Sequence, residues 1–157
     1  MVVEPNMAKY EAYKTMHVDL KKAMGSGFYY QAIFIEYAIA EDRCRSALVC
    51  ARVKCINSRG QELKLSAKIN KLKSNSAFTA KYPRSRLTLE LLDELYTWKQ
   101  DRDALVHNLA NIPYNDNAVR EVAERGKKLI DTLSNRVKSV NNYYKKLYSE
   151  AESKVNG

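Results

Sequence analysis

The chain is poor in the two residues that most often interrupt regular structure. Only five Gly and three Pro occur in 157 residues, which excludes a collagen-like or low-complexity chain and argues against a turn-rich β fold. Long apolar runs are lacking too, since no stretch approaches the roughly 20 residues needed to span a bilayer. The opening residues, MVVEPNMAKYEAYK, lack the apolar centre of a signal peptide. We therefore expect a cytoplasmic protein without membrane contact.

Cysteine is also scarce and unsuitably spaced for a metal or disulfide framework. The three cysteines, Cys44, Cys50 and Cys55, lie five or more positions apart, whereas zinc and redox motifs use close CxxC pairs. We expect small buried side chains at these positions. A di-iron bundle needs Glu three residues before His, but Lys14 and Ala104 hold those positions ahead of the two histidines. The sequence thus predicts no metal and no cofactor.

Helical periodicity is what the sequence does contain. Apolar residues make up 45 % of the chain, and in several segments they recur three or four positions apart. Gly25-Ser26-Gly27 predicts a tight connection, and Thr88 suits a helix N-cap. The segment ELKLSAK fits a helix or an alternating strand. The helices that we expect span residues 7–24, 28–53, 58–74, 88–109 and 117–148. This order predicts an all-α, up-and-down bundle of about five helices in a single domain, residues 1–157.

Positive charge is concentrated in the middle of the chain. Residues 52–86 hold ten Lys and Arg but one acid, and this excess of +9 equals the net charge of the whole protein. Such a segment indicates a polyanionic partner, most simply RNA, or else a solvated helix face. Phe78 and Tyr82 are candidates for stacking on bases, with burial in the core as the alternative. The basic residues expected to contact RNA are Lys64, Lys68, Lys71, Lys73, Lys81, Arg84 and Arg86.

The candidate site is the segment around Arg102 and His107. It follows Trp98 and a charged cluster, residues 99–103, and a loop comes directly after it. Metal-free RNA cleavage must deprotonate the 2′-hydroxyl, protonate the leaving 5′-oxygen and stabilise charge on phosphorus. Histidine serves as acid or base near neutrality, and arginine offers a charged, planar fork to phosphate oxygens. The two residues lie about 140° apart around an ideal helix, which favours a composite site formed by two copies across a homodimer.

The run Arg102-Asp103-Ala104-Leu105-Val106-His107, late in a helical chain and ahead of a long final helix, resembles the HEPN superfamily (higher eukaryotes and prokaryotes nucleotide-binding). The resemblance implies a helical bundle acting as a dimeric, metal-independent ribonuclease in toxin–antitoxin or phage-defence systems, with an antitoxin protein as a candidate partner. Two positions depart from the family pattern. Many members have Asn after the Arg, where this chain has Asp103. Members modified by a nucleotidyltransferase carry Tyr two residues after the His, where this chain has Leu109.

The resemblance also implies acidic support for the site. Family members often place an acid on the helix that packs against the motif, so Glu36 or Asp42 is expected to orient His107. Asp103 is expected to orient Arg102 or His107. For Glu36, the alternative is a buried acid paired with Arg43. The candidate catalytic residues are Arg102, His107, Glu36 and Asp103.

Two functions stay open after this. The first is a metal-independent endoribonuclease, a toxin or defence effector. The alternative is a non-catalytic helical module that binds RNA, a nucleotide or a partner protein, with Arg102 and His107 as ligand contacts or packing residues. His17 is expected to be a structural or a surface residue, because no Cys or second His lies near it and no Arg precedes it.

Overall fold

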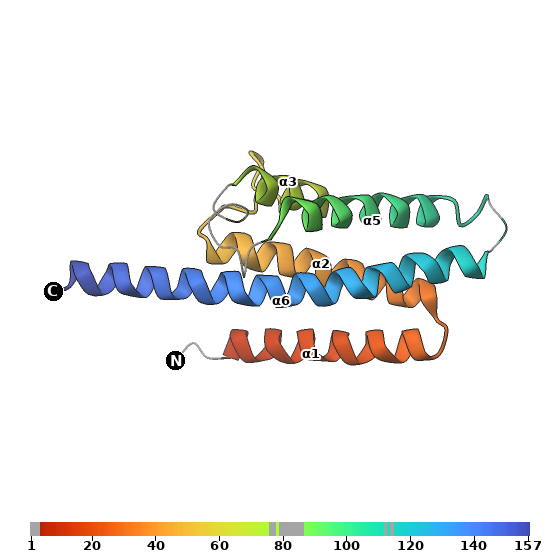
Figure 1. Cartoon of the computed structure of the whole chain (residues 1–157), viewed down its shortest axis with the longest axis horizontal. Coiled ribbons are helices and arrows are strands. Elements are labelled where there is room, and N and C mark those ends of the chain that lie inside the picture. The colour runs from red at the N-terminus through yellow and green to blue at the C-terminus, as the bar shows by residue number, and fades with distance from the viewer. Residues whose placement is uncertain (1–3, 76–77, 79–86, 112, 114) are drawn as a thin grey trace.

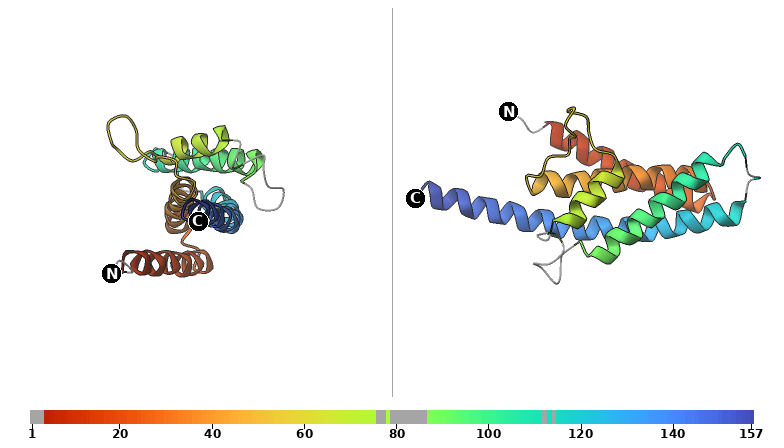
Figure 2. Two further views of the ribbon diagram at one scale, coloured as in Figure 1. Left: turned by 90° about the vertical axis from the view of Figure 1, so that its left-hand side faces the viewer. Right: turned by 90° about the horizontal axis from the view of Figure 1, so that it is seen from above.

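The computed structural model describes residues 4–75, 78, 87–111, 113 and 115–157, and the described part is all-α, as expected. Its helices form three layers (Figures 1 and 2): α1 on one side, α2 beside α6 in the middle, and α3 with α5 on the other side. The chain thus brings the candidate site on α5 against the central layer. The bounds are α1 Glu4–Gly25, α2 Tyr29–Cys50, α3 Leu65–Ser74, α5 Leu89–His107 and α6 Asp116–Val155.

Helix α2 is the central element of the bundle. It packs against α1, α3 and α6, and its contact with α6 is the most extensive between any two described helices. A helix surrounded in this way must be apolar on more than one face, and α2 accordingly buries residues along most of its length. The buried residues of α2 are Ala32, Ile33, Glu36, Ile39, Ala40, Cys44, Ala47 and Leu48.

Helix α6 is one continuous element of 40 residues, or about 60 Å. It begins at a cap in which the Asn115 side chain accepts a hydrogen bond from the Ala118 backbone N–H at 3.2 Å. It ends at Val155, beyond the predicted residue 148, and its C-terminal turns extend past the other helices (Figure 1). Apolar residues that mostly recur three or four positions apart form a stripe along it, and this stripe is buried as far as Tyr144: Val119, Val122, Ile130, Leu133, Val137, Val140 and Tyr144.

The prediction of a helix over residues 58–74 is wrong for residues 58–64. Residues 55–63 form a β-hairpin-like turn, called the hairpin below, with an isolated bridge between Ile56 and Glu62. The Asn57 side-chain oxygen accepts hydrogen bonds from the backbone N–H groups of Arg59 and Gln61 at 2.9 and 3.0 Å. Gly60 has a φ of +75°, which glycine adopts without steric cost. This turn chemistry delays the helix, and α3 begins at Leu65.

Two local predictions at helix ends are confirmed. Helix α1 ends at Gly25, and Gly27 follows with a φ of +73°. The Thr88 hydroxyl accepts a hydrogen bond from the Leu91 backbone N–H at 3.1 Å and so caps α5. Across the described helices, no stretch combines the length and the apolarity that crossing a bilayer requires.

Candidate functional site

Trp98 fixes the position of α5 in the bundle. Its indole is fully buried, and Nε1 donates a hydrogen bond to the Val122 carbonyl oxygen of α6 at 3.0 Å. Leu91, Leu92 and Leu95 bury the same helix further toward its start. The last three turns of α5, which carry the candidate site, are therefore held on a rigid support.

Arg102 lies against two aromatic rings of α2. The centre of its guanidinium is 4.2 Å from the ring centroid of Tyr37 and 5.3 Å from that of Phe34, distances at which a cation is attracted to a ring face. The Arg102 side chain is 16 % exposed, and its Nε has no hydrogen-bond partner among the described residues. Phe34 itself is 48 % exposed. A cation is thus held at the edge of the surface, beside an open aromatic side chain.

Asp103 lies between two cations of the same helix. Its carboxylate accepts a hydrogen bond from Arg102 Nη1 at 2.9 Å and forms an ion pair with Lys99 Nζ at 2.7 Å. Burial alone raises the pKa of Asp103, but the hydrogen bonds and charges of Lys99 and Arg102 outweigh it and hold the pKa below its usual range. The hydrogen bond between Lys99 and Asp103 also raises the pKa of Lys99. The described contacts support Asp103 orienting Arg102 and give no contact between Asp103 and His107.

His107 is the last residue of α5 and is exposed to solvent. It lies four positions after Asp103, hence on the same helix face. Within the described part of the chain, no hydrogen bond or ion pair joins His107 to Arg102, Glu36 or Asp42. Arg102 and His107 are therefore neighbours along one helix but not a pair within one chain.

Glu36 lies at the junction of α2, α5 and α6, away from His107. It is fully buried, close to the Trp98 indole and to Gly126. Trp98 precedes His107 by nine positions, roughly 13 Å along the helix, so Glu36 does not orient His107 within one chain. Pairing with Arg43 is also wrong, because that guanidinium binds Asp42 at 2.6 Å.

Burial sets the protonation of Glu36. Neither carboxylate oxygen has a hydrogen-bond partner among the described residues. Desolvation raises the pKa of Glu36 from 4.5 to about 9, with Lys127 lowering it and Asp131 raising it. The group is thus a neutral acid at physiological pH. Asp42, the other expected orienting acid, is bound to Arg43 and to Lys9 at 3.2 Å.

Gly126 is the residue of this junction that the sequence analysis missed. A Cβ at this position would lie 2.6 Å from Trp98 Nε1 and closer still to Glu36 Oε2. Only a glycine lets α6 approach both side chains this closely. The available signal was an isolated glycine inside a long amphipathic helix, which costs about 1 kcal/mol and often marks close packing.

Lys68, expected to contact RNA, is fully buried. Its Nζ donates a hydrogen bond to Glu62 Oε1 at 2.9 Å and lies 3.6 Å from Glu41 Oε1. The side chain is therefore unavailable to a phosphate, and its role is to hold the hairpin against α2 and α3. The expectation of a lysine on the RNA-facing surface is wrong at this position.

The other residues that were expected to contact RNA differ in how available they are. Lys64 is exposed and forms no ion pair with any described residue. Lys71 donates to the Lys54 carbonyl oxygen at 2.7 Å, and Lys73 is paired with Asp93. Phe78 is buried against Tyr144, which excludes it from base stacking. The other candidates, Lys81, Tyr82, Arg84 and Arg86, lie outside the described residues.

His17 and the cysteines make no reactive cluster. His17 is half-buried with its ring edge-on to Tyr13 at 4.5 Å, and burial lowers its pKa. Cys44 and Cys55 are buried and Cys50 half-buried, all three as free thiols. Among the residues that the structure describes, no three His, Cys, Asp or Glu side chains are grouped to hold a metal ion.

A hollow beside the candidate site lies on the α6 side of α5. It has a volume of about 490 Å³, and its lining includes Leu105 of α5 and Val119 and Arg125 of α6. Asp101 of α5 forms an ion pair with Arg125 at its wall. Arg102 faces α2 instead, so this hollow does not connect the two candidate catalytic residues.

The chain was compared with known protein families, curated proteins and solved structures. No family model, no curated protein and no solved structure matches the chain.

Proposed function

We propose that the protein is a metal-independent endoribonuclease of the HEPN type, with its site formed where the Arg102–His107 segments of two copies face each other. The observation that carries the proposal is the presentation of these two residues. The Arg102 guanidinium is held at the surface by Tyr37 and Asp103, and His107 is exposed at the end of the same rigid helix. His107 is open to a ligand, Arg102 reaches the surface with part of its guanidinium while bonded to Asp103, and the two residues do not engage each other.

The reaction needs no group beyond these residues. His107 of one copy accepts the proton of the ribose 2′-hydroxyl, and the 2′-oxygen attacks the adjacent phosphorus. The P–O5′ bond breaks, and the protonated His107 gives its proton to the leaving 5′-oxygen. Arg102 of the second copy donates N–H hydrogen bonds to the non-bridging oxygens and so stabilises the phosphorane. The products are a 2′,3′-cyclic phosphate and a 5′-hydroxyl.

The surface around Arg102 supports a second copy at this place. Phe34 exposes 48 % of its surface directly beside the guanidinium, and an exposed aromatic ring next to an arginine is typical of the centre of an interface. A second copy that covers Phe34 would bring its own α5 toward Arg102. The 140° separation within one helix then no longer prevents the two residues from meeting on one phosphate.

The test is cleavage of RNA in EDTA by the purified protein and by Arg102→Ala and His107→Ala. Loss of a positioned acid or base lowers the rate by about 10²–10⁴-fold, while circular dichroism should show an intact fold. His17→Ala, which removes the other histidine, serves as the matched control and should keep its activity. Cleavage that survives in both site variants would overturn the proposal.

A mixing experiment tests the composite site. If Arg102 and His107 act from different copies, the two inactive variants should regain partial activity when they are unfolded together and refolded into mixed dimers. One site of such a dimer holds both wild-type residues. A monomeric active species, or mixtures as inactive as their parents, would contradict a shared site.

A non-catalytic RNA-binding module is the second candidate, and Asp103 favours it. Its carboxylate bonds to the Arg102 guanidinium at the place that a phosphate would need. Asp103→Asn separates the two functions, because it removes the competing charge and keeps the side-chain shape. An enzyme should cleave faster after this change, whereas a binding module should bind RNA more tightly without any turnover.

A further inference from the structure

The hairpin, residues 55–63, projects from the helical layers on the side of α3 (Figure 2, left). Its two arms are joined by two backbone hydrogen bonds, from the Leu63 N–H to the Cys55 carbonyl oxygen at 2.8 Å and from the Asn57 N–H to the Gln61 carbonyl oxygen at 2.8 Å. Asn57 adds a side-chain hydrogen bond to Gln61 at 3.2 Å. A loop with this many internal bonds has a defined shape and loses little conformational entropy on binding a partner.

The base of the hairpin is tied to the helices by buried and half-buried charges. Glu62 accepts a hydrogen bond from the buried Lys68 and lies 3.1 Å from Arg45 Nε of α2. Lys71 of α3 donates to the Lys54 carbonyl oxygen just before the hairpin. The single acid of the hairpin, Glu62, has a half-exposed side chain, and it is paired with both Lys68 and Arg45.

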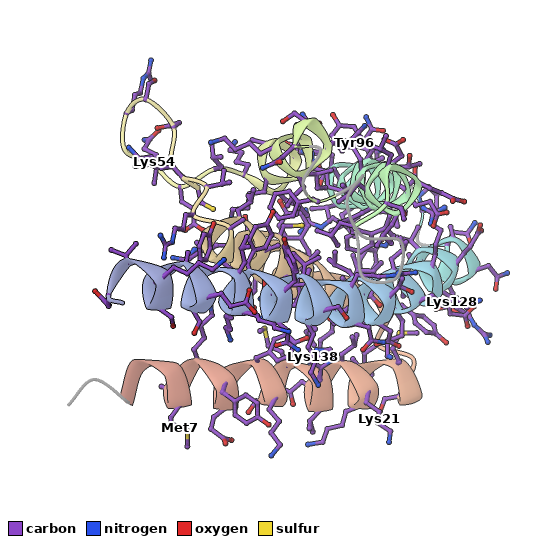
Figure 3. The ribbon with its side chains drawn as sticks, turned by 60° about the vertical axis from the view of Figure 1, so that its left-hand side comes forward. Met7, Lys21, Lys54, Tyr96, Lys128 and Lys138 are labelled. Atoms are coloured by element: carbon purple, nitrogen blue, oxygen red, sulfur yellow. The ribbon has the colours of Figure 1, made fainter. Side chains whose placement is uncertain are left out.

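The exposed charges in and beside the hairpin that have no ion-pair partner among the described residues are all positive. Lys54, Arg59 and Lys64 are exposed, and none of them forms an ion pair with a described residue. Lys54 enters the hairpin (Figure 3), Arg59 lies at its tip, and Lys64 leaves it. Cations without partners on a rigid projection lower the electrostatic free energy of a polyanion bound there.

We propose that this hairpin is a second RNA-binding element, which holds phosphates of the substrate strand away from the site of cleavage. The inference rests on the proposed function for the nature of the polyanion. His107 ends α5 at the far end of the bundle from the hairpin (Figure 1), and α5 alone has 19 residues. That helix is about 28 Å long, which equals roughly eight nucleotides of a strand stacked as in a duplex, at 3.4 Å each. The substrate class is therefore a stacked RNA strand, longer than the active-site segment alone can hold.

The experiment compares binding of a ~6-nucleotide and a ~24-nucleotide RNA strand, lengths below and above the span given by the helix rise. The variant is Lys54→Gln with Arg59→Gln. The matched control is Lys21→Gln with Lys128→Gln, two exposed lysines of α1 and α6 that lie away from the hairpin (Figure 3). Both double variants lose the same net charge. Affinity is measured by fluorescence anisotropy over a range of salt concentrations.

Wild type and control should bind the long strand more tightly than the short one. The hairpin variant should lose about tenfold in affinity for the long strand, and its logarithmic salt slope should fall by about 1.4, or 0.7 for each phosphate contact to a single strand. Equal losses of affinity in the hairpin and control variants would overturn the inference. The same result is expected if the hairpin binds an acidic protein instead of RNA. Tight hairpin-dependent binding by a protein that never cleaves RNA would overturn the proposed function and leave this inference standing.

Discussion

Two junctions in the interior each bury one charged side chain, and they treat that charge in opposite ways. Lys68, where α2 meets α3 and the hairpin, and Glu36, where α2 meets α5 and α6, both have 0 % exposure. Lys68 has two carboxylates within 3.6 Å. Glu36 has no hydrogen-bond partner for either oxygen among the described residues. Burying a charge without a partner is costly, so an acid in that position takes up a proton instead.

The difference in partners gives both residues a role other than the one expected from the sequence. Lys68 lies against the carboxylates of Glu62 and Glu41, and these ion pairs hold the hairpin in place. Glu36 is neutral at physiological pH because its pKa is raised to about 9. The lysine expected to contact RNA is a positioning residue, and the acid expected to support catalysis is a core group. Burial alone does not distinguish the two cases, because the partners of each residue decide its role.

Glu36→Gln is expected to have the largest effect on the free energy of unfolding. A folded-state pKa above the unfolded value means that the native state binds the extra proton, so stability falls as pH rises from about 4.5 to 9. The slope is about 1.4 kcal/mol per pH unit for one group. Glutamine does not ionise, so the variant should be more stable than wild type at pH 7 by up to about 3 kcal/mol.

Urea unfolding at several pH values between 5 and 9 checks this prediction. The advantage of Glu36→Gln should shrink toward pH 5, where wild type is protonated in both states. Glu11→Gln, the same change at an exposed acid of α1, should follow wild type throughout. Parallel pH profiles for wild type and Glu36→Gln would show that the buried acid does not couple to folding.

Gly126→Ala tests how closely the helices approach each other at the Glu36 junction. The new methyl group would overlap Glu36 and the Trp98 indole, and overpacking of this kind costs about 1–3 kcal/mol. Gly25→Ala is the control, since nothing lies within 4 Å of a Cβ there. We expect a lower midpoint in thermal unfolding for Gly126→Ala alone. Equal midpoints for the two variants would contradict the close contact.

The sequence predicted the elements better than their contacts, for a physical reason. The stripe of α6 and the Thr88 cap depend on spacings within one helix, and these are visible in the sequence. The hairpin depends on the turn residues Asn57 and Gly60, which interrupt the helix that the apolar spacing of this segment predicts. Arg102 and His107 were expected late on a helix and lie there, but the contact of Arg102 with Tyr37 joins residues 65 positions apart. Partners of that kind, like those of Lys68 and Glu36, arise only from tertiary packing.

Lys68→Met is expected to have the smallest effect on global stability and a local effect on the hairpin. Methionine fills a similar volume, and the carboxylates that it leaves behind, Glu62 and Glu41, are 54 % and 39 % exposed and can be hydrated. Because no buried charge is left unpaired, the change in unfolding free energy should stay within about 1 kcal/mol. The hairpin, however, loses its tie to the helices, and its amides should open more often.

Hydrogen exchange at the Gln61 and Leu63 amides measures that opening, because both N–H groups are bonded inside the hairpin. Their exchange should speed up in Lys68→Met and stay unchanged in Lys73→Met, which removes a neighbouring lysine paired with Asp93 instead. If both variants left the hairpin amides equally protected, the internal hydrogen bonds alone would hold its shape. The contrast between the two junctions would then concern protonation only, since the buried lysine would no longer position anything.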